Sequence, residues 1–293
     1  MSETWTIQRL LNWTTEHFKS NNLESARLET EILLAHALDL QRIQLYANFN
    51  REVQPHHLAI FRSYVERRLK NEPLAYIVGF QPFLGLDFEV NNHVLIPRPE
   101  TEQLVELAIE RVKGSSLFTE SPNPLILDIG TGSGCIAVSL AKYLPNAHVI
   151  GIDISEQALE IAKRNAVKHG VQDRCQFVVK NMLEKNVAET FRFPHDLIIS
   201  NPPYIRSADI ETLEPNVKDW EPKQALDGGA DGLDYIRALF HLIPKGLNPK
   251  GLIMFEFGIG QAKEILNLSQ GIFKETKIVK DLAGIERIFV GKI

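Results

Sequence analysis

Seven short apolar runs from residue 125 onward constrain the fold of the chain most strongly. Stretches with helical periodicity separate most of them, and they read LILDI (125–129), AHVIGI (147–152), CQFVVK (175–180), DLIIS (196–200), GLIMFEF (251–257), TKIVK (276–280) and RIFVG (287–291). Strands that alternate with helices form right-handed crossovers, which predicts a mostly parallel sheet with helices on both faces. Ligands of such sheets bind outside the carboxyl ends of the strands. We therefore expect the functional residues at that edge.

The N-terminal part has a different period. Up to residue 75 the apolar residues keep helical spacing, as shown by Ile7, Leu10, Leu11, Thr14 and Phe18, then Leu33, Leu34, Ala37 and Leu38, then Leu58, Phe61, Val65 and Leu69. This pattern predicts a small all-helical domain over 1–75. The domain carries nine basic and nine acidic residues, which is no footprint for nucleic acid. Spacing alone leaves a stabilising cap and a protein-docking module equally open.

A β-hairpin is expected between the two regions, within a linker over 76–97. Leu84, Leu86, Phe88 and Val90 alternate with polar residues, and Asn91-Asn92 offers a turn before a second run at 93–96. The remaining residues, 98–293, then form the α/β domain.

Bulk properties exclude several classes of protein. No run approaches the roughly 18 apolar residues of a membrane span, and the N-terminus lacks the layout of a secretory signal, so we expect a cytoplasmic chain. The net charge of −5 argues against a broad phosphate-binding surface. Cys135 and Cys175 are the only cysteines, and we expect neither a disulfide nor a metal site.

A glycine-rich loop follows the first apolar run of the α/β region. Gly130, Gly132 and Gly134 allow a tight turn and close approach of a ligand to the backbone. Asp153 follows the next run, where an acid can accept hydrogen bonds from ribose hydroxyls. The Gly-x-Gly-x-Gly spacing differs from the dinucleotide pattern, and Asp128 could pair with a cationic amine or bond to the loop amides. These features favour S-adenosylmethionine over NAD.

The tetrapeptide NPPY (201–204) ends the fourth run, on the same edge as the loop. Its prolines hold φ fixed and cannot continue a hydrogen-bonded ladder, so the segment forms a stiff shelf. The side-chain carbonyl of Asn201 and the main-chain carbonyl of Pro202 offer two acceptors, and Tyr204 offers a flat ring. This set suits a planar –NH₂ group, whose nitrogen it would orient toward a methyl donor.

Together these motifs resemble the HemK/PrmC family of protein-glutamine N5-methyltransferases, which modify the Gly-Gly-Gln motif of peptide chain release factors. The resemblance covers nearly the whole chain and includes EPLAYIVG (72–79), LIPRPETE (95–102), LDIGTGSG (127–134), NPPYI (201–205), EPKQALDGGADGL (221–233), FEFGIGQ (255–261) and DLAGIERI (281–288). It implies a class I, Rossmann-like methyltransferase fold with a seven-stranded sheet. It also implies that the N-terminal helices help to bind the release factor, and we expect a monomer.

The resemblance assigns roles to individual residues. It implies that the loop of Gly130, Thr131, Gly132, Ser133 and Gly134 wraps the methionine end of S-adenosylmethionine, that Asp153 holds the ribose, and that Asn201, Pro202, Pro203 and Tyr204 hold the glutamine amide. The family commonly has an aspartate after the third strand, facing the adenine amino group. Here that place holds Asn181, whose carbonyl can still accept the hydrogen bond, and Met182 could pack on the adenine face.

Three other readings remain open from the residues. A glutamine methyltransferase acting on a ribosomal protein would share the same shelf. A nucleic-acid base methyltransferase would place a flipped adenine there, but it would need a basic groove that is not evident. A non-catalytic binding module would not need the glycine loop, Asp153 and NPPY together.

Overall fold

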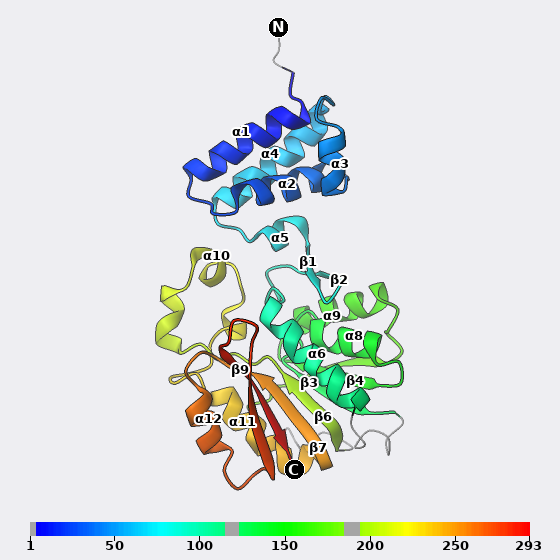
Figure 1. Ribbon diagram of the computed structural model, residues 1–293, viewed down its shortest axis with the longest axis vertical. Helices are drawn as coiled ribbons and strands as arrows, with labels where there is room; N and C mark the ends of the chain where they lie inside the picture. Colours follow the sequence, from blue (N-terminus) through cyan, green and yellow to red (C-terminus); the bar gives the residue numbers. More distant parts are fainter. Residues whose placement is uncertain (1–3, 115–122, 185–193) are drawn as a thin grey trace. The chain divides into compact units, whose positions relative to one another are not determined.

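The computed structural model describes residues 4–114, 123–184 and 194–293, and side-chain placement is described for all of these except 243–245. The chain divides into two compact units (Figure 1). The first comprises residues up to Gly79 together with Pro215–Trp220, and the second comprises Phe80–Glu214 and Glu221–Ile293.

The first unit is helical, as its spacing predicted. Its helices are α1 (Ile7–Ser20), α2 (Ala26–Ala37), α3 (Arg42–Ala47), α4 (Pro55–Leu69), α5 (Leu74–Val78) and the short α10 (Pro215–Lys218). Helix α2 packs against α1, α3, α4 and α5. The Thr6 hydroxyl accepts a hydrogen bond from Arg9 N at 3.3 Å and so caps α1, and Pro55 begins α4 at a position where its missing N–H is not needed. Most of the apolar residues at helical spacing are buried, which confirms the predicted helix faces.

A β-hairpin follows, but its turn lies earlier than predicted. The strands are β1 (Phe80–Phe83) and β2 (Leu86–Glu89), and the turn is at Leu84 and Gly85. Both turn residues have positive φ, of 48° and 72°, which is the conformation of a two-residue hairpin turn. The expected turn at Asn91 is instead a local loop, in which the Asn91 side chain accepts from His93 N. A leucine in a left-handed turn cannot be read from an apolar alternation, so the prediction placed Leu84 in a strand.

The second unit contains the predicted seven-stranded sheet. Its strands are β3 (Leu125–Ile129), β4 (His148–Asp153), β5 (Cys175–Val179), β6 (His195–Ser200), β7 (Leu247–Glu256), β8 (Glu275–Lys280) and β9 (Glu286–Lys292), in the spatial order β5-β4-β3-β6-β7-β9-β8. Strand β9 runs antiparallel to both of its neighbours, and the other pairings are parallel. The sheet is therefore mostly parallel, and all seven apolar runs became strands.

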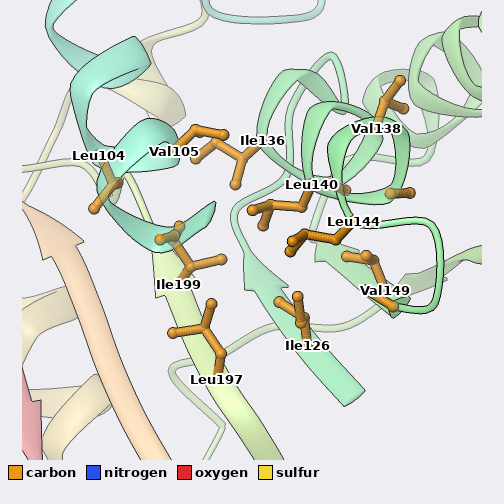
Figure 2. Close-up of a cluster of buried hydrophobic side chains, with 14 of the residues drawn as sticks. Leu104, Val105, Ile126, Ile136, Val138, Leu140, Leu144, Val149, Leu197 and Ile199 are labelled. Atoms are coloured by element: carbon orange, nitrogen blue, oxygen red, sulfur yellow. The ribbon is translucent and has the colours of Figure 1, made fainter. Parts of the chain in front are cut away.

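Helices cover both faces of this sheet (Figure 1). Helices α6 (Pro99–Gly114), α8 (Cys135–Tyr143) and α9 (Glu156–Lys168) contribute to the core on one face, and α11 (Asp234–Gly246) and α12 (Ala262–Leu268) to the core on the other. Short 3-10 turns lie at Ser207–Thr212 and Lys223–Ala225. Side chains alternate along the strands, so Leu197 and Ile199 point toward α6 and α8 (Figure 2), whereas Ile198 joins the opposite core. Burial on both faces explains why the strands read as continuous apolar runs.

The strand order reverses at β3. Strand β4 lies on one side of β3, and β6 lies on the other. The connections that leave β3 and β6 therefore diverge at their carboxyl ends, which is the position where open α/β sheets hold ligands. Among the helices that the structure describes, none is long and apolar enough to span a bilayer.

Candidate active site

A cavity of about 300 Å³ opens at the carboxyl ends of β3, β4, β5 and β6, within the second unit. Eight of the residues predicted for the site line it: Gly130, Gly132, Asp153, Asn181, Met182, Asn201, Pro202 and Pro203. The other predicted residues, Thr131, Ser133, Gly134 and Tyr204, are not part of its wall. The glycine loop, Asp153 and the proline segment thus lie around one cavity. The four remaining residues lie behind the cavity wall.

The turn from β3 into α8 depends on its glycines. Gly130, Gly132 and Gly134 have φ values of 71°, 53° and 79°, a region that side chains other than glycine rarely adopt. Gly134 also packs tightly, since a Cβ there would lie 3.0 Å from the Cβ of Ala162 on α9. Gly130 and Gly132 face the cavity with bare backbone. Ser133 is buried behind the loop, where its carbonyl accepts from Asn165 Nδ2 at 2.9 Å.

Asp128 fixes the loop from beneath. Its Oδ2 accepts from the Thr131 hydroxyl at 2.6 Å and from Ala137 N at 3.1 Å, and the residue has no exposed surface. Burial raises the pKa of Asp128 to about 7, although both hydrogen bonds oppose that shift. The sequence left two roles open for this carboxyl, which were pairing with a cationic amine and bonding to the loop. The structure shows bonds to the loop and to the first turn of α8, and the carboxyl is not exposed to a ligand amine.

Asp153 ends β4 at the edge of the cavity. Its Oδ2 accepts from Gly132 N and its Oδ1 from Ser155 N, both at 2.9 Å. Burial raises the pKa of this carboxyl, and the backbone hydrogen bonds limit the rise. A carboxylate has about four acceptor positions, so Asp153 can accept further hydrogen bonds from a ligand in the cavity. The side chain is thereby held rigidly while it keeps its capacity as an acceptor.

Asn181 and Met182 follow β5 and line the same cavity. Asn181 Oδ1 accepts from Leu183 N at 3.0 Å, which fixes the side chain in a local turn. Met182 is 7% exposed and packs with the apolar side chains under α11. The pair therefore offers one oriented amide and one apolar surface to a ligand.

The NPPY shelf, residues Asn201–Tyr204, leaves the end of β6. Asn201 Nδ2 donates to the Thr101 hydroxyl oxygen at 2.9 Å. Within the described residues, neither Asn201 Oδ1 nor the Pro202 carbonyl oxygen accepts a hydrogen bond. The Tyr204 hydroxyl donates to Glu256 Oε1 at 3.2 Å, and burial raises the pKa of this phenol. The shelf therefore presents two carbonyl acceptors, and Tyr204 supports it from behind.

The glycine-rich segment at 227–232 holds the shelf in place. Ile205 N donates to the Leu226 carbonyl, and Gly228 N donates to the Ile205 carbonyl. A Cβ on Gly228 would lie 2.8 Å from the Pro203 carbonyl oxygen, so only glycine permits this approach. Gln261 Nε2 donates to the Tyr204 carbonyl at 3.0 Å and completes the support. No role was predicted for this segment from the sequence, although its glycines could have suggested one.

No role was predicted for Glu221, the first residue of the EPKQALDGGADGL segment. Its Oε1 accepts from Arg98 Nη2 at 2.6 Å, and its Oε2 accepts from Ile96 N at 3.2 Å. Burial raises the pKa of Glu221, and Arg98 opposes the rise. The contact joins the PRPETE segment to the segment that begins at Pro222, and both segments adjoin the cavity wall. Arg98 thus acts through Glu221. The acidic residues in the first turn of α6, Glu100 and Glu102, are also common at an ordinary helix start, because negative charge there complements the helix dipole.

The chain matches known proteins over nearly its whole length. The PrmC N-terminal domain matches residues 9–79, and a methyltransferase domain matches residues 120–268. A release factor glutamine methyltransferase from Geobacter sulfurreducens is 46% identical over 292 residues, which cover 99% of this chain and 98% of that relative. The chain belongs to the release factor glutamine methyltransferase family. A family member from Rhodopirellula baltica is 41% identical, over 97% of this chain and 95% of its own length.

Solved structures support the fold of this family member. A methyltransferase from Pyrococcus furiosus superimposes with a TM-score of 0.52, at 18% identity, over 78% of this chain and 96% of that one. At this level of identity the likeness concerns the fold alone. It confirms the Rossmann-like methyltransferase architecture that the sequence predicted.

Proposed function

We propose that this chain transfers a methyl group from S-adenosylmethionine to the side-chain amide nitrogen of the glutamine in the Gly-Gly-Gln motif of peptide chain release factors. One observation carries the proposal beyond family membership. Asn201 Oδ1 and the Pro202 carbonyl, two acceptors without a partner among the described residues, stand beside a cavity that the glycine loop and Asp153 also line. An acceptor pair of this kind suits a primary amide, which has two N–H donors.

The cavity suits the proposed methyl donor. Its volume of about 300 Å³ lies at the lower end of the range for small-molecule sites. Gly130 and Gly132 leave the backbone bare on one side, Asp153 offers acceptors for ribose hydroxyls, and Met182 offers an apolar surface for a flat base. When bound, S-adenosylmethionine supplies an electrophilic methyl group. We propose that these residues, with Asn181, fix its position relative to the shelf.

The NPPY shelf would do its work by orientation. An amide nitrogen is a weak nucleophile because its lone pair is delocalised into the carbonyl. Two acceptors that hold both N–H bonds fix the direction of that lone pair, and they also favour the positive charge that the nitrogen gains as its new bond forms. Pro202 and Pro203 keep the acceptors rigid, since their φ angles are fixed by the ring. Just after transfer the methylated nitrogen still carries both of its protons and a positive charge. This cation is strongly acidic, so it can release one proton without a dedicated base and become the neutral N-methyl amide.

The first unit is proposed to bind the body of the release factor. Support comes from the match of residues 9–79 to the PrmC N-terminal domain. Trp13 on α1 also packs edge-on against Trp5, which precedes the helix, at 6.2 Å between ring centroids, and it stacks on His17, at 4.9 Å. Trp13 is 53% exposed, and exposed aromatic side chains often anchor protein interfaces. Trp13→Ala should raise KM for the whole release factor and leave KM for a Gly-Gly-Gln peptide unchanged.

The decisive experiment is mass spectrometry of a purified release factor after incubation with this protein and S-adenosylmethionine. We expect one added methyl group on the glutamine of the Gly-Gly-Gln motif. Asn201→Ala is the matched control, and it should bind the cofactor normally but lose most transfer. A methyl group found on a ribosomal protein or on an adenine base, with none on the release factor, would contradict the proposal.

We further propose that the enzyme acts as a single chain in the cytoplasm, where release factors work on ribosomes. Sedimentation of the active protein checks this, and activity confined to a dimer would contradict it.

A further inference from the structure

Three residues distant in sequence form a hydrogen-bonded chain behind the NPPY shelf. Asn201 Nδ2 donates to Thr101 Oγ1 at 2.9 Å, and Thr101 Oγ1 donates to Glu256 Oε2 at 2.7 Å. The other carboxyl oxygen, Glu256 Oε1, accepts from the Tyr204 hydroxyl at 3.2 Å. Thr101 lies in the first turn of α6, and Glu256 is the last residue of β7. Both are only 2% exposed, so water does not compete for these bonds.

The direction of every bond in the chain follows from the charge on Glu256. An ionised carboxylate only accepts hydrogen bonds, so the hydroxyls of Thr101 and Tyr204 must both donate to it. Thr101 has a single hydroxyl proton, and once it is donated to Glu256 the oxygen can only accept from Asn201. The atom of Asn201 that faces Thr101 must then be Nδ2. The carbonyl end of the amide, Oδ1, is left as the free end of a side chain that lines the cavity.

We propose that Thr101 and Glu256 are positioning residues for methyl transfer, because the buried carboxylate fixes, through the Thr101 hydroxyl, which end of the Asn201 amide is offered to the substrate. The inference rests on the proposed function. A flipped Asn201 would present Nδ2 to the substrate amide, and two donors would then face each other. The same carboxylate holds the Tyr204 hydroxyl, so one buried charge fixes both ends of the shelf.

The chain predicts a dependence of the rate on pH. A protonated Glu256 would have to donate to one of the two hydroxyl oxygens and would no longer define the direction of the chain. Burial raises the pKa of Glu256, and the hydrogen bonds from Thr101 and Tyr204 lower this pKa. Among the charged groups around the carboxyl, Arg287 on β9 lowers the pKa and Glu100 on α6 raises it. The net rise means that the active, ionised form is reached at a higher pH than for an ordinary glutamate. Turnover should therefore increase as the pH rises through the pKa of Glu256.

Thr101→Val and Thr101→Ser are the matched test of this arrangement. Valine keeps the shape of threonine but has no hydroxyl, whereas serine keeps the hydroxyl. With the full-length chain, a whole release factor and S-adenosylmethionine, we expect Thr101→Val to lower kcat by about 10- to 100-fold, the order of loss for a displaced reacting group. KM for the cofactor should change little, and Thr101→Ser should restore turnover.

Glu256→Gln gives an independent measurement. Glutamine has nearly the size of glutamate but does not ionise, so the rise of kcat with pH that is expected for the wild type should be absent from this variant. This outcome is not expected of a residue that only stabilises the fold. Thermal unfolding of each variant, measured in parallel, separates loss of folded protein from loss of turnover.

The possible outcomes are distinguishable. Wild-type turnover by Thr101→Val, an equal loss in Thr101→Ser, or an unchanged pH profile in Glu256→Gln would each overturn the inference while leaving the proposed function intact. Failure of the wild-type protein to methylate the release factor would overturn the proposed function and this inference with it.

Discussion

Replacing Gly232 with alanine tests how accurately the NPPY shelf must be placed. A Cβ at this position would lie 2.4 Å from the Tyr204 carbonyl oxygen and 2.6 Å from Gln261 Nε2. Ordinary contact begins at 3.4 Å, so the carbonyl would have to retreat by 3.4 − 2.4 = 1.0 Å. The same carbonyl is held by Gln261, so the new methyl group disturbs the bond that supports the shelf.

This displacement should reach the reacting group. Tyr204 follows Pro203 and Pro202 directly, and their fixed φ angles leave little freedom to absorb a shift before Asn201. A misplacement of about 1 Å at a reacting group lowers the rate by about 10²-fold. We therefore expect kcat for release factor methylation to fall by about that factor.

Gly170→Ala is the matched control. Its φ of 70° is close to the 78° of Gly232, but a Cβ there would meet nothing within 4 Å. Both variants should lose about 1–2 kcal/mol of unfolding free energy from the left-handed conformation alone. Gly232→Ala should lose more, because it adds the steric clash. Urea unfolding and turnover measured on both variants check this, and wild-type kcat in Gly232→Ala would refute the reasoning.

Three further predictions concern other sites. Asn181→Asp keeps the acceptor for Leu183 N and adds a negative charge that strengthens a hydrogen bond from the adenine amino group. Calorimetry should therefore show that S-adenosylmethionine binds more tightly by about 1 kcal/mol, and weaker binding would contradict an adenine contact here. Glu31→Ala leaves Arg27 and Arg42 without their carboxylate partner. Both arginine side chains are about half exposed, so chemical unfolding should show a loss of about 2 kcal/mol in the free energy of unfolding, below the range for fully buried pairs. The raised pKa of Asp128, about 7, means that the folded chain keeps a proton that the unfolded chain releases near pH 4. Stability should therefore fall between pH 4 and pH 7, and Asp128→Asn should flatten that fall; equal slopes would refute the assignment.

The sheet could be predicted from the sequence because burial on both faces leaves a plain signal. In β6 the residues from Leu197 to Ser200 are all buried, so the strand reads as an unbroken apolar run. The hairpin turn was placed wrongly because its position depends on the backbone of Leu84. A positive φ at leucine is rare, and nothing in the alternation of apolar residues indicates it.

Motifs at strand ends predicted the position of the cavity for a similar reason. The carboxyl ends of neighbouring parallel strands meet at one edge, so a glycine loop, Asp153 and NPPY had to come together once the strands were placed. The same reasoning could not distinguish side chains that line the cavity from side chains that lie behind it. Thr131 and Tyr204 belong to the right motifs but lie behind the cavity, because the direction of a side chain depends on what packs around it.

Glu256 shows what a closer reading of the sequence could have found. It stands between Phe255 and Phe257 in a run that is otherwise apolar and buried, and a carboxylate is almost never buried without a partner. The run alone therefore requires a hydrogen-bond donor from elsewhere in the chain. The identity of that donor could not be predicted, since Thr101 lies 155 residues away and looks like part of an ordinary helix start. A charged residue that interrupts an apolar strand at the ligand edge is thus a signal for a positioning network, and only the tertiary structure names its members.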